Sequence, residues 1–101
     1  MKIIVLFNLS ADADVAAYED WAKSIDIPGV NALSSVRDFE VLRSSGLLGG
    51  EGKPSYQYIE IIDVADMDAF GAQTSTEAFQ KVASAFGDFA DNPEFILTEA
   101  L

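Results

Sequence analysis

The chain has 101 residues, the length of one domain, and half of them are hydrophobic, which is enough for a buried core. Six Lys and Arg stand against 17 Asp and Glu, and this net charge of −11 opposes binding to nucleic acid or to anionic lipid. There is no cysteine and no histidine, which excludes disulfides, thiolate metal sites and the Ser-His and Cys-His catalytic pairs.

The first part of the chain predicts a strand, a helix and a second strand. Residues 2–8, KIIVLFN, form a short apolar run rich in β-branched residues, which favours a strand. Apolar residues then recur at spacings of three and four from Val15 to Ile25, and we expect Pro28-Gly29 to end this helix. Polar and apolar residues alternate over 36–43, which predicts the second strand.

A glycine-rich stretch, SSGLLGGEGKPS, follows over residues 44–55. It resembles a phosphate-binding loop only superficially, because the glycine spacing is wrong, Pro54 stands where a hydroxyl residue is needed, and the stretch joins two strands. We predict the long tip of a hairpin, whose second strand covers residues 56–64.

The last part of the chain predicts a helical region in two pieces and a final strand. The region begins at Asp66, breaks at Ser75 and is expected to end at Asn92-Pro93, before a short strand over residues 95–98. The resulting order, strand-helix-strand-strand-helix-strand, is the split βαβ order of ferredoxin-like folds. We therefore predict a single α+β domain over residues 1–101 with a four-stranded antiparallel sheet, and right-handed crossovers place both helices on the same face.

The first strand is apolar on both faces, and the predicted helices can cover only one of them. Several hundred Å² of exposed apolar surface would cost many kcal/mol at about 25 cal/mol per Å² and would mark an interaction surface. A second copy, packed sheet to sheet around a two-fold axis, would cover it. The sequence thus predicts a homodimer with a barrel-like body, a dimeric α+β barrel, and a cavity between the two sheets.

The alternation of residues along the strands assigns side chains to this expected cavity. With Ile3, Val5 and Phe7 under the helices, the residues expected to face the partner sheet are Ile4, Leu6, Asn8, Asp38, Glu40, Tyr56, Tyr58 and Glu60. In this arrangement Asn8 would be a polar group at the edge of the cavity.

Because histidine is absent, acid–base chemistry would fall to carboxyl or phenol groups. Glu60, Glu40 and Asp38 are the candidates, since burial and nearby like charges raise the pKa of a carboxyl group. Asp38 and Glu40 are better explained as solvated residues of an edge strand, while both explanations stay open for Glu60. Tyr58 and Trp21 could stack on a flat ligand or belong to the core.

A metal site is not expected. Asp63, Asp66 and Asp68 are explained by the favourable electrostatics of a helix N-terminus. We predict no structural metal and no cofactor.

Short stretches spread over nearly the whole chain, among them LFNL, YEDWA, SSVRDFEVLR, YQYIEII and FADNPEFILTE, together resemble the REDY-like proteins of the dimeric α+β barrel superfamily. That family is associated with the biosynthesis of prodiginine-type pigments. The resemblance implies a homodimeric ferredoxin-like barrel in secondary metabolism, acting on pyrrole- or indole-derived intermediates. Haem-degrading members of the superfamily share an asparagine similar to Asn8 and a Trp, but they need a histidine that this chain lacks.

The functional hypothesis is a cytoplasmic, cofactor-free protein that binds a flat heteroaromatic intermediate and assists proton transfer or condensation. Glu60 would be the acid–base group, with Asn8 and Tyr58 orienting the substrate. The residues expected to contact the substrate are Trp21, Asp26, Glu40 and Leu6. Two alternatives stay open, a non-catalytic carrier of a reactive intermediate and a cofactor-independent monooxygenase. Neither a signal peptide nor a membrane span is indicated.

Overall fold

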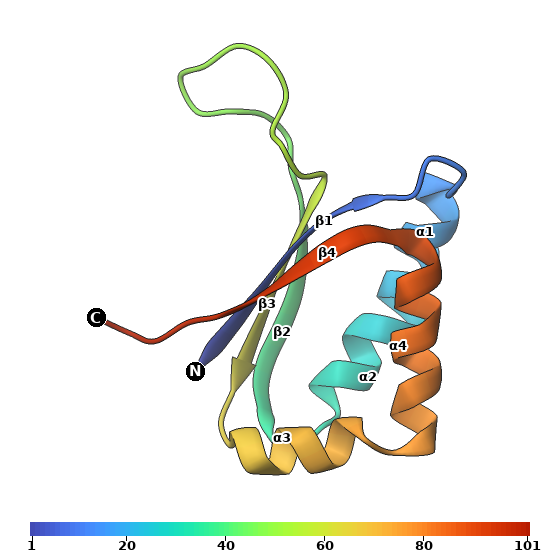
Figure 1. Ribbon diagram of the computed structural model, residues 1–101, viewed down its shortest axis with the longest axis vertical. Helices are drawn as coiled ribbons and strands as arrows, with labels where there is room; N and C mark the ends of the chain where they lie inside the picture. The colour runs from blue at the N-terminus through green and yellow to red at the C-terminus, as the bar shows by residue number, and fades with distance from the viewer.

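The computed structural model describes all residues 1–101 as an antiparallel four-stranded sheet with its helices gathered on one face (Figure 1). The strands are β1 (Lys2–Leu9), β2 (Val36–Arg43), β3 (Tyr58–Val64) and β4 (Ala90–Leu97), in the sheet order β2-β3-β1-β4. The helices are α1 (Val15–Trp21), the π-helix η1 (Ala22–Asp26), α2 (Ile27–Asn31), α3 (Met67–Thr74) and α4 (Glu77–Phe89). This confirms the predicted α+β, ferredoxin-like fold with helices on a single face.

Strand β1 lies inside the sheet, which is where a strand that is apolar on both faces belongs. It pairs with β3 on one side and with β4 on the other. As predicted, Ile3, Val5 and Phe7 are buried under the helices. Ile4 and Leu6, on the opposite face, stay partly exposed because no element of the chain covers them.

The first helical region begins at Asp14, whose carboxylate caps the first turn, but it does not end at Pro28-Gly29 as predicted. In η1 the backbone widens into a π turn, and the N–H of Ile27 donates to the carbonyl of Ala22, five residues earlier. Pro28 has no N–H to contribute to a regular helical ladder, but it is tolerated in the first turn of a helix. Here it opens α2 rather than closing the preceding helix.

The second helical region has the predicted two pieces. The Asp66 carboxylate caps α3, and the hydroxyl of Thr76 accepts a hydrogen bond from the N–H of Phe79 to cap α4. None of the helices is long and apolar enough to cross a membrane.

The end of α4 differs from the prediction. The helix stops at Phe89, and β4 begins directly at Ala90, so Asn92-Pro93 lies within a strand. Asn92 has a φ of 47°, and the pairing of β4 with β1 shifts at this point, between Leu6 and Asn8. Proline has no backbone N–H to donate to a neighbouring strand. An edge strand accommodates it at such an irregularity because no hydrogen bond to a neighbour is needed there.

An arm formed by residues 44–57 joins β2 to β3 and extends beyond the sheet (Figure 1). Its base is held by Asn8, whose Nδ2 donates to the carbonyl of Ser55 at 3.1 Å and whose Oδ1 accepts from the N–H of Gln57 at 2.9 Å. The side chain of Gln57 in turn accepts from the N–H of Leu9 at 2.6 Å. The amide at the end of the apolar strand therefore anchors the arm.

The core fills only part of the space between the sheet and the helices. Around α1, Phe7 stacks on Tyr58 with ring centroids 5.4 Å apart, and Tyr18 contacts both rings edge-on. On the other side, α3 and α4 bury no residue completely. The sheet and α4 are thus not packed against each other along their length.

Candidate functional site

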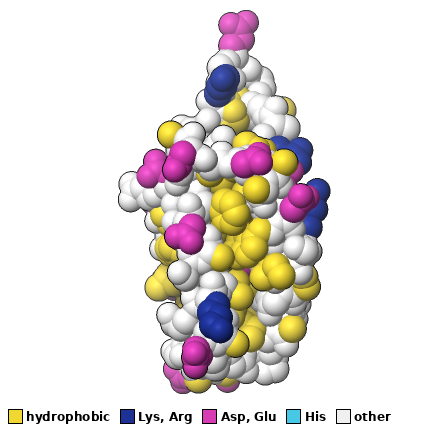
Figure 2. All heavy atoms as spheres, turned by 90° about the vertical axis from the view of Figure 1, so that its right-hand side faces the viewer, with side chains coloured by type: hydrophobic (Ala, Val, Ile, Leu, Met, Phe, Trp, Pro, Cys, Tyr) yellow, Lys and Arg dark blue, Asp and Glu magenta, His cyan; other side chains and the backbone are white.

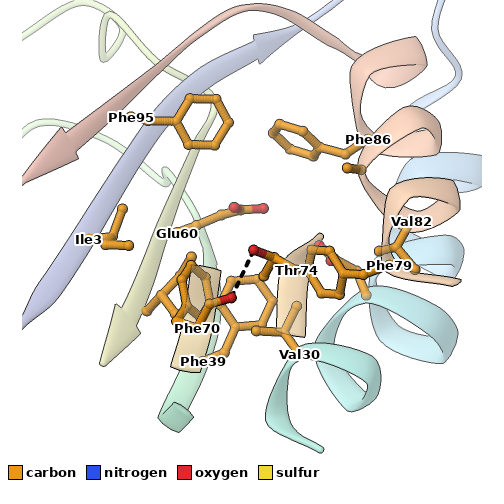
Figure 3. Close-up of a pocket in the computed structure, with 13 residues that line it drawn as sticks. Ile3, Val30, Phe39, Glu60, Phe70, Thr74, Phe79, Val82, Phe86 and Phe95 are labelled. Carbon is orange, nitrogen blue, oxygen red and sulfur yellow. Dashed lines mark hydrogen bonds between the residues drawn. The ribbon is translucent and has the colours of Figure 1, made fainter. Parts of the chain in front are cut away.

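A cavity of about 260 Å³ lies between the sheet and α4 (Figure 3). Ten of its thirteen lining residues are hydrophobic, and the five phenylalanines among them are Phe39, Phe70, Phe79, Phe86 and Phe95. The remaining three are Asp26, Glu60 and Thr74. The cavity therefore offers aromatic walls and very few polar groups, as small-molecule sites typically do.

The cavity exists because α4 turns its apolar side toward the sheet but contacts it only in part, as where the ring of Phe86 lies 5.0 Å from that of Phe7. Phe79, Val82 and Phe86 point from α4 into the space, and they are only half-buried. Figure 2 shows hydrophobic side chains gathered in the middle of the face that carries the helices, with acidic side chains around them. Apolar surface left open on the inner side of a helix is available to a ligand.

Glu60 projects from β3 into this cavity (Figure 3). It is 5% exposed, and its Oε2 has no hydrogen-bond partner. Burial, together with the nearby carboxylate of Asp26, raises the pKa of Glu60 to about 8. A carboxyl group with this pKa holds its proton at neutral pH and can exchange it readily.

Asp26, the last residue of η1, supplies the second carboxyl group of the cavity and is also 5% exposed. Burial raises its pKa to about 6, so it is the more acidic member of the pair. Single π-helical turns inside α-helices occur frequently at functional sites.

The third polar residue of the cavity is already satisfied. The hydroxyl of Thr74 donates to the carbonyl of Phe70 at 2.8 Å, the interaction drawn in Figure 3. The two carboxyl groups are thus the polar groups that a ligand would meet.

The expectation that Tyr58 and Glu60 face away from the helices is wrong. In the sheet register, Tyr58 lies opposite Phe7 and Glu60 lies opposite Val5, and directly opposite residues share a face. Both side chains therefore lie on the helix face. The cavity that Glu60 enters accordingly lies between the sheet and the helices of one chain.

Tyr58 is held outside the cavity by a surface ion pair. Its hydroxyl donates to Oε2 of Glu19 at 2.7 Å, and Arg43 donates to the same carboxylate at 2.8 and 2.6 Å. The hydrogen bonds from Arg43 and Tyr58 lower the pKa of Glu19 to about 2. Burial and the bond to Glu19 raise the pKa of Tyr58 to about 12, so it stays a neutral donor.

The other predicted site residues also lie elsewhere. Asn8 anchors the arm, and Leu6 and Glu40 lie on the face of the sheet opposite to the helices. Trp21 packs against Tyr18 and Phe89, with ring centroids 6.1 and 5.6 Å away. Of the predicted site residues, the cavity brings together Glu60 and Asp26.

Sequence reasoning did not identify the aromatic wall as a site. Phe79 and Phe86 recur at helical spacing, which indicates only that they lie on one side of a helix. Tyr18 was also missed as a polar group: its buried hydroxyl has no partner, and burial followed by the charge of Glu60 raises its pKa. Periodicity identifies an inward face without showing whether the space behind it is filled.

The arrangement suits an apolar aromatic ligand that exchanges a proton at one end. No group of three or more Asp and Glu side chains lies close enough together to hold a metal ion. The aromatic walls can take a flat ring, while the pair of carboxyl groups can hold or release a proton against its polar atom.

The fold has clear relatives among solved structures. HapK from Hahella chejuensis is 28% identical, with 100% of this chain aligned to 95% of that chain and a TM-score of 0.73. A dimeric ferredoxin-like protein of unknown function from Thermobifida fusca is 14% identical, with coverages of 94% and 85% and a TM-score of 0.71. SnoaB, a cofactor-independent oxygenase from Streptomyces nogalater, is 15% identical, with coverages of 99% and 93% and a TM-score of 0.71.

The comparison with curated proteins gives no match. The family model described as REDY-like protein HapK, in contrast, matches residues 1–101. The chain therefore belongs to the REDY-like HapK family.

Proposed function

We propose that this protein binds a flat, largely apolar heteroaromatic intermediate in the cavity under α4 and assists a proton-transfer or condensation step at its polar end. The observation that carries this proposal is the pair of buried carboxyl groups, Glu60 and Asp26, in a cavity whose other walls are mainly aromatic and aliphatic. Membership in the family supports a place in the formation of prodiginine-like, pyrrole- or indole-derived pigments.

Glu60 is the acid–base group of this proposal. At neutral pH its proton is available to a ligand atom, because a pKa of about 8 keeps the carboxyl group mostly neutral. In the condensation of an aldehyde with a pyrrole, a C–C bond forms and the carbonyl oxygen leaves as water, assisted by the proton from Glu60. The two hydrogens of that water come, in the net reaction, from the pyrrole C–H and N–H, so Glu60 regains its proton. No oxidant is needed for this balance.

The walls would position the rings. Phe39 and Phe70 lie on one side of Glu60, while Phe86 and Phe95 lie on the other (Figure 3). Holding two reactants in a fixed orientation converts a bimolecular step into an effectively unimolecular one. Binding two rings side by side is therefore a way to accelerate condensation even with a single acid.

The test is the condensation of a pyrrole carbaldehyde with a dimethylpyrrole at neutral pH, followed by the visible absorption of the dipyrrolic product. The purified protein is expected to raise the rate above the background, and Glu60→Gln is expected to lower that gain about 100-fold or more, the usual contribution of a general acid. Asp20→Asn, which removes an exposed carboxylate on α1, is the matched control.

A second measurement separates an enzyme from the alternative of a carrier. Ala83→Trp places a large ring on the α4 wall and is expected to block both binding and rate. Suppose that wild type binds the aldehyde stoichiometrically, that Ala83→Trp prevents this binding, and that the rate of condensation stays at background. The protein is then a carrier. If wild type neither binds the aldehyde nor changes the rate, the proposed function is wrong.

We also propose that the protein is a homodimer assembled through the outer face of the sheet. All helices lie on the other side (Figure 1), and the apolar residues left on the outer face are Ile4, Leu6, Leu42, Ile59, Ile61 and Ile96. The Thermobifida fusca neighbour, described as dimeric and ferredoxin-like, supports a dimeric state here. In this arrangement each copy keeps its own cavity, on the side away from the interface.

A further inference from the structure

The cavity contains acidic groups but no basic group. Its thirteen lining residues include Asp26 and Glu60 and no lysine or arginine. The whole chain has six basic residues and no histidine, so its net charge of −11 adds to the negative field inside the cavity. The polar end of the cavity is therefore a place where positive charge would be stabilised.

Neither carboxyl group forms an ion pair, and Glu60 also lacks a hydrogen-bond partner at one of its oxygens. Oε2 of Glu60 makes no hydrogen bond, and the two ion pairs of the chain, Arg37–Asp63 and Arg43–Glu19, lie outside the cavity. A buried charge without a partner is costly, so buried carboxylates are paired as a rule. Here the missing partner has to come from the ligand.

The two carboxyl groups favour one chemical class of ligand over the others. An anionic ligand would meet like charge, and a ligand without polar atoms would leave the carboxyl groups as they are. A ligand with only a carbonyl oxygen could accept the proton of Glu60 but would give the carboxylate of Asp26 nothing to bind. A nitrogen base, once protonated, donates to a carboxylate in a charge-assisted hydrogen bond, which is about twice as strong as a neutral one.

We infer that the ligand of this cavity carries a basic ring nitrogen and is held in its protonated form between Glu60 and Asp26. In the binding step the nitrogen lone pair takes the proton from the Glu60 carboxyl group, which becomes a carboxylate, and no other bond changes. The resulting N–H⁺ faces two carboxylates, while the rings lie between the phenylalanines. This inference rests on the proposed function, because it names the class of ligand for the same site.

The two acids have different roles in binding this ligand. Asp26, the more acidic of the pair, supplies the negative charge already present in the empty cavity, and Glu60 supplies the proton. A weak base that is neutral in solution at pH 7 should therefore become protonated on entering the cavity.

The test uses isoquinoline and naphthalene, two bicyclic rings of the same shape that differ by one nitrogen. Isoquinoline is a weak base whose ultraviolet spectrum differs between its neutral and protonated forms. At pH 7 wild type is expected to bind isoquinoline at least about tenfold more tightly than naphthalene, as a charge-assisted hydrogen bond predicts. The bound isoquinoline should show the spectrum of the protonated form.

Variants assign the effect to the carboxyl groups. Glu60→Gln and Asp26→Asn should each reduce the preference for isoquinoline to about twofold or less, and their affinity for naphthalene shows that the cavity is intact. Asp20→Asn, which removes an exposed carboxylate outside the cavity, should leave the preference unchanged. Ala83→Trp should abolish binding of both rings.

Each failure has a distinct meaning. If both rings bind equally and the bound isoquinoline stays neutral, the inference is overturned while the proposed ligand cavity stands. If Asp20→Asn lowers the preference as much as Glu60→Gln does, the effect comes from net charge, and the inference is again overturned. If neither ring binds, the proposed function itself fails.

Discussion

Glu60 on β3 and Asp26 at the end of η1 bring two carboxyl groups into one apolar cavity, close enough for the charge of Asp26 to oppose the ionisation of Glu60. Each side chain comes from a different layer of the fold, one from the sheet and one from the helices. Their proximity is therefore a product of the tertiary structure, because the helices must lie over the sheet to bring them together.

This pair makes the stability of the protein depend on pH. The pKa of Glu60 is about 8 in the folded protein, against an ordinary value of 4.5, so the folded state holds a proton that the unfolded chain releases. The contribution of Glu60 is fully present below pH 4.5 and is lost as the pH rises toward 8. The free energy of unfolding should fall across this window by at most about 1.4 kcal/mol per pH unit for this group.

Glu60→Gln tests this prediction, because the amide cannot ionise. The difference in free energy of unfolding between the variant and wild type should shift in favour of the variant by roughly 2–4 kcal/mol from pH 5 to pH 8. Urea unfolding measures it. The groups that face Glu60 are Asp26 from η1 and Tyr18 from α1, and Asp26 adds a smaller loss between pH 3.8 and about 6. Parallel stability curves for wild type and Glu60→Gln would contradict the prediction.

The two buried tyrosines should respond oppositely to the same substitution. Tyr58→Phe removes a hydrogen bond of 2.7 Å to Glu19 and should cost about 1 kcal/mol. Tyr18→Phe removes a buried hydroxyl that has no partner, so it should leave stability unchanged or raise it by up to about 1 kcal/mol. Thermal and urea unfolding of the pair provide the measurement. An equal loss in both variants would show that Tyr18 has a partner of similar strength.

The fold was predictable from the sequence because its signals are local. The β-branched run of β1, the spacing of apolar residues in α4 and the N-caps at Asp14 and Asp66 each act within a few residues of the chain. The end of the first helix was not predictable in the same way. Whether Pro28 ends a helix or begins one depends on the π turn before it.

The site was only partly predictable, for a physical reason. Alternation along β3 groups Tyr58 with Glu60 on one face, but it does not say which face of β1 that group joins. The register decides this, since Glu60 pairs with Val5 and not with Leu6, and a slip of one residue would reverse the assignment. The unfilled space between α4 and the sheet is likewise a tertiary property that has no periodic signal.

The proposed homodimer predicts that a charge on the outer face of the sheet will dissociate it. Ile61 lies in β3 beside Ile4, within the apolar part of this face. Ile61→Glu would bury two unpaired carboxylates across a two-fold interface, so the variant should be a monomer at micromolar concentration while wild type is a dimer. Light scattering after gel filtration measures the mass, and circular dichroism confirms the fold.

Ala17→Glu, on the exposed side of α1, is the matched control and should leave the dimer intact. The cavity lies on the other side of the sheet, so Ile61→Glu monomers should still bind naphthalene with wild-type affinity. A wild-type protein that is monomeric at micromolar concentration would rule out the proposed assembly.

The position of Asn8 predicts a role in holding the arm rather than in catalysis. Its side chain makes two hydrogen bonds to the backbone at the base of residues 44–57, one to Ser55 and one from Gln57. Asn8→Ala removes both and should cost about 1–2 kcal/mol of stability. Because the loss is local, amide hydrogen exchange in the arm should accelerate more than in β1. Asn8→Asp keeps the acceptor for Gln57 but lacks the donor for Ser55, and it should give an intermediate effect.

Neither variant should change the affinity of the cavity for naphthalene or the rate of condensation, since Asn8 does not line the cavity. A variant with a protected arm and a lost condensation rate would instead place Asn8 in the reaction.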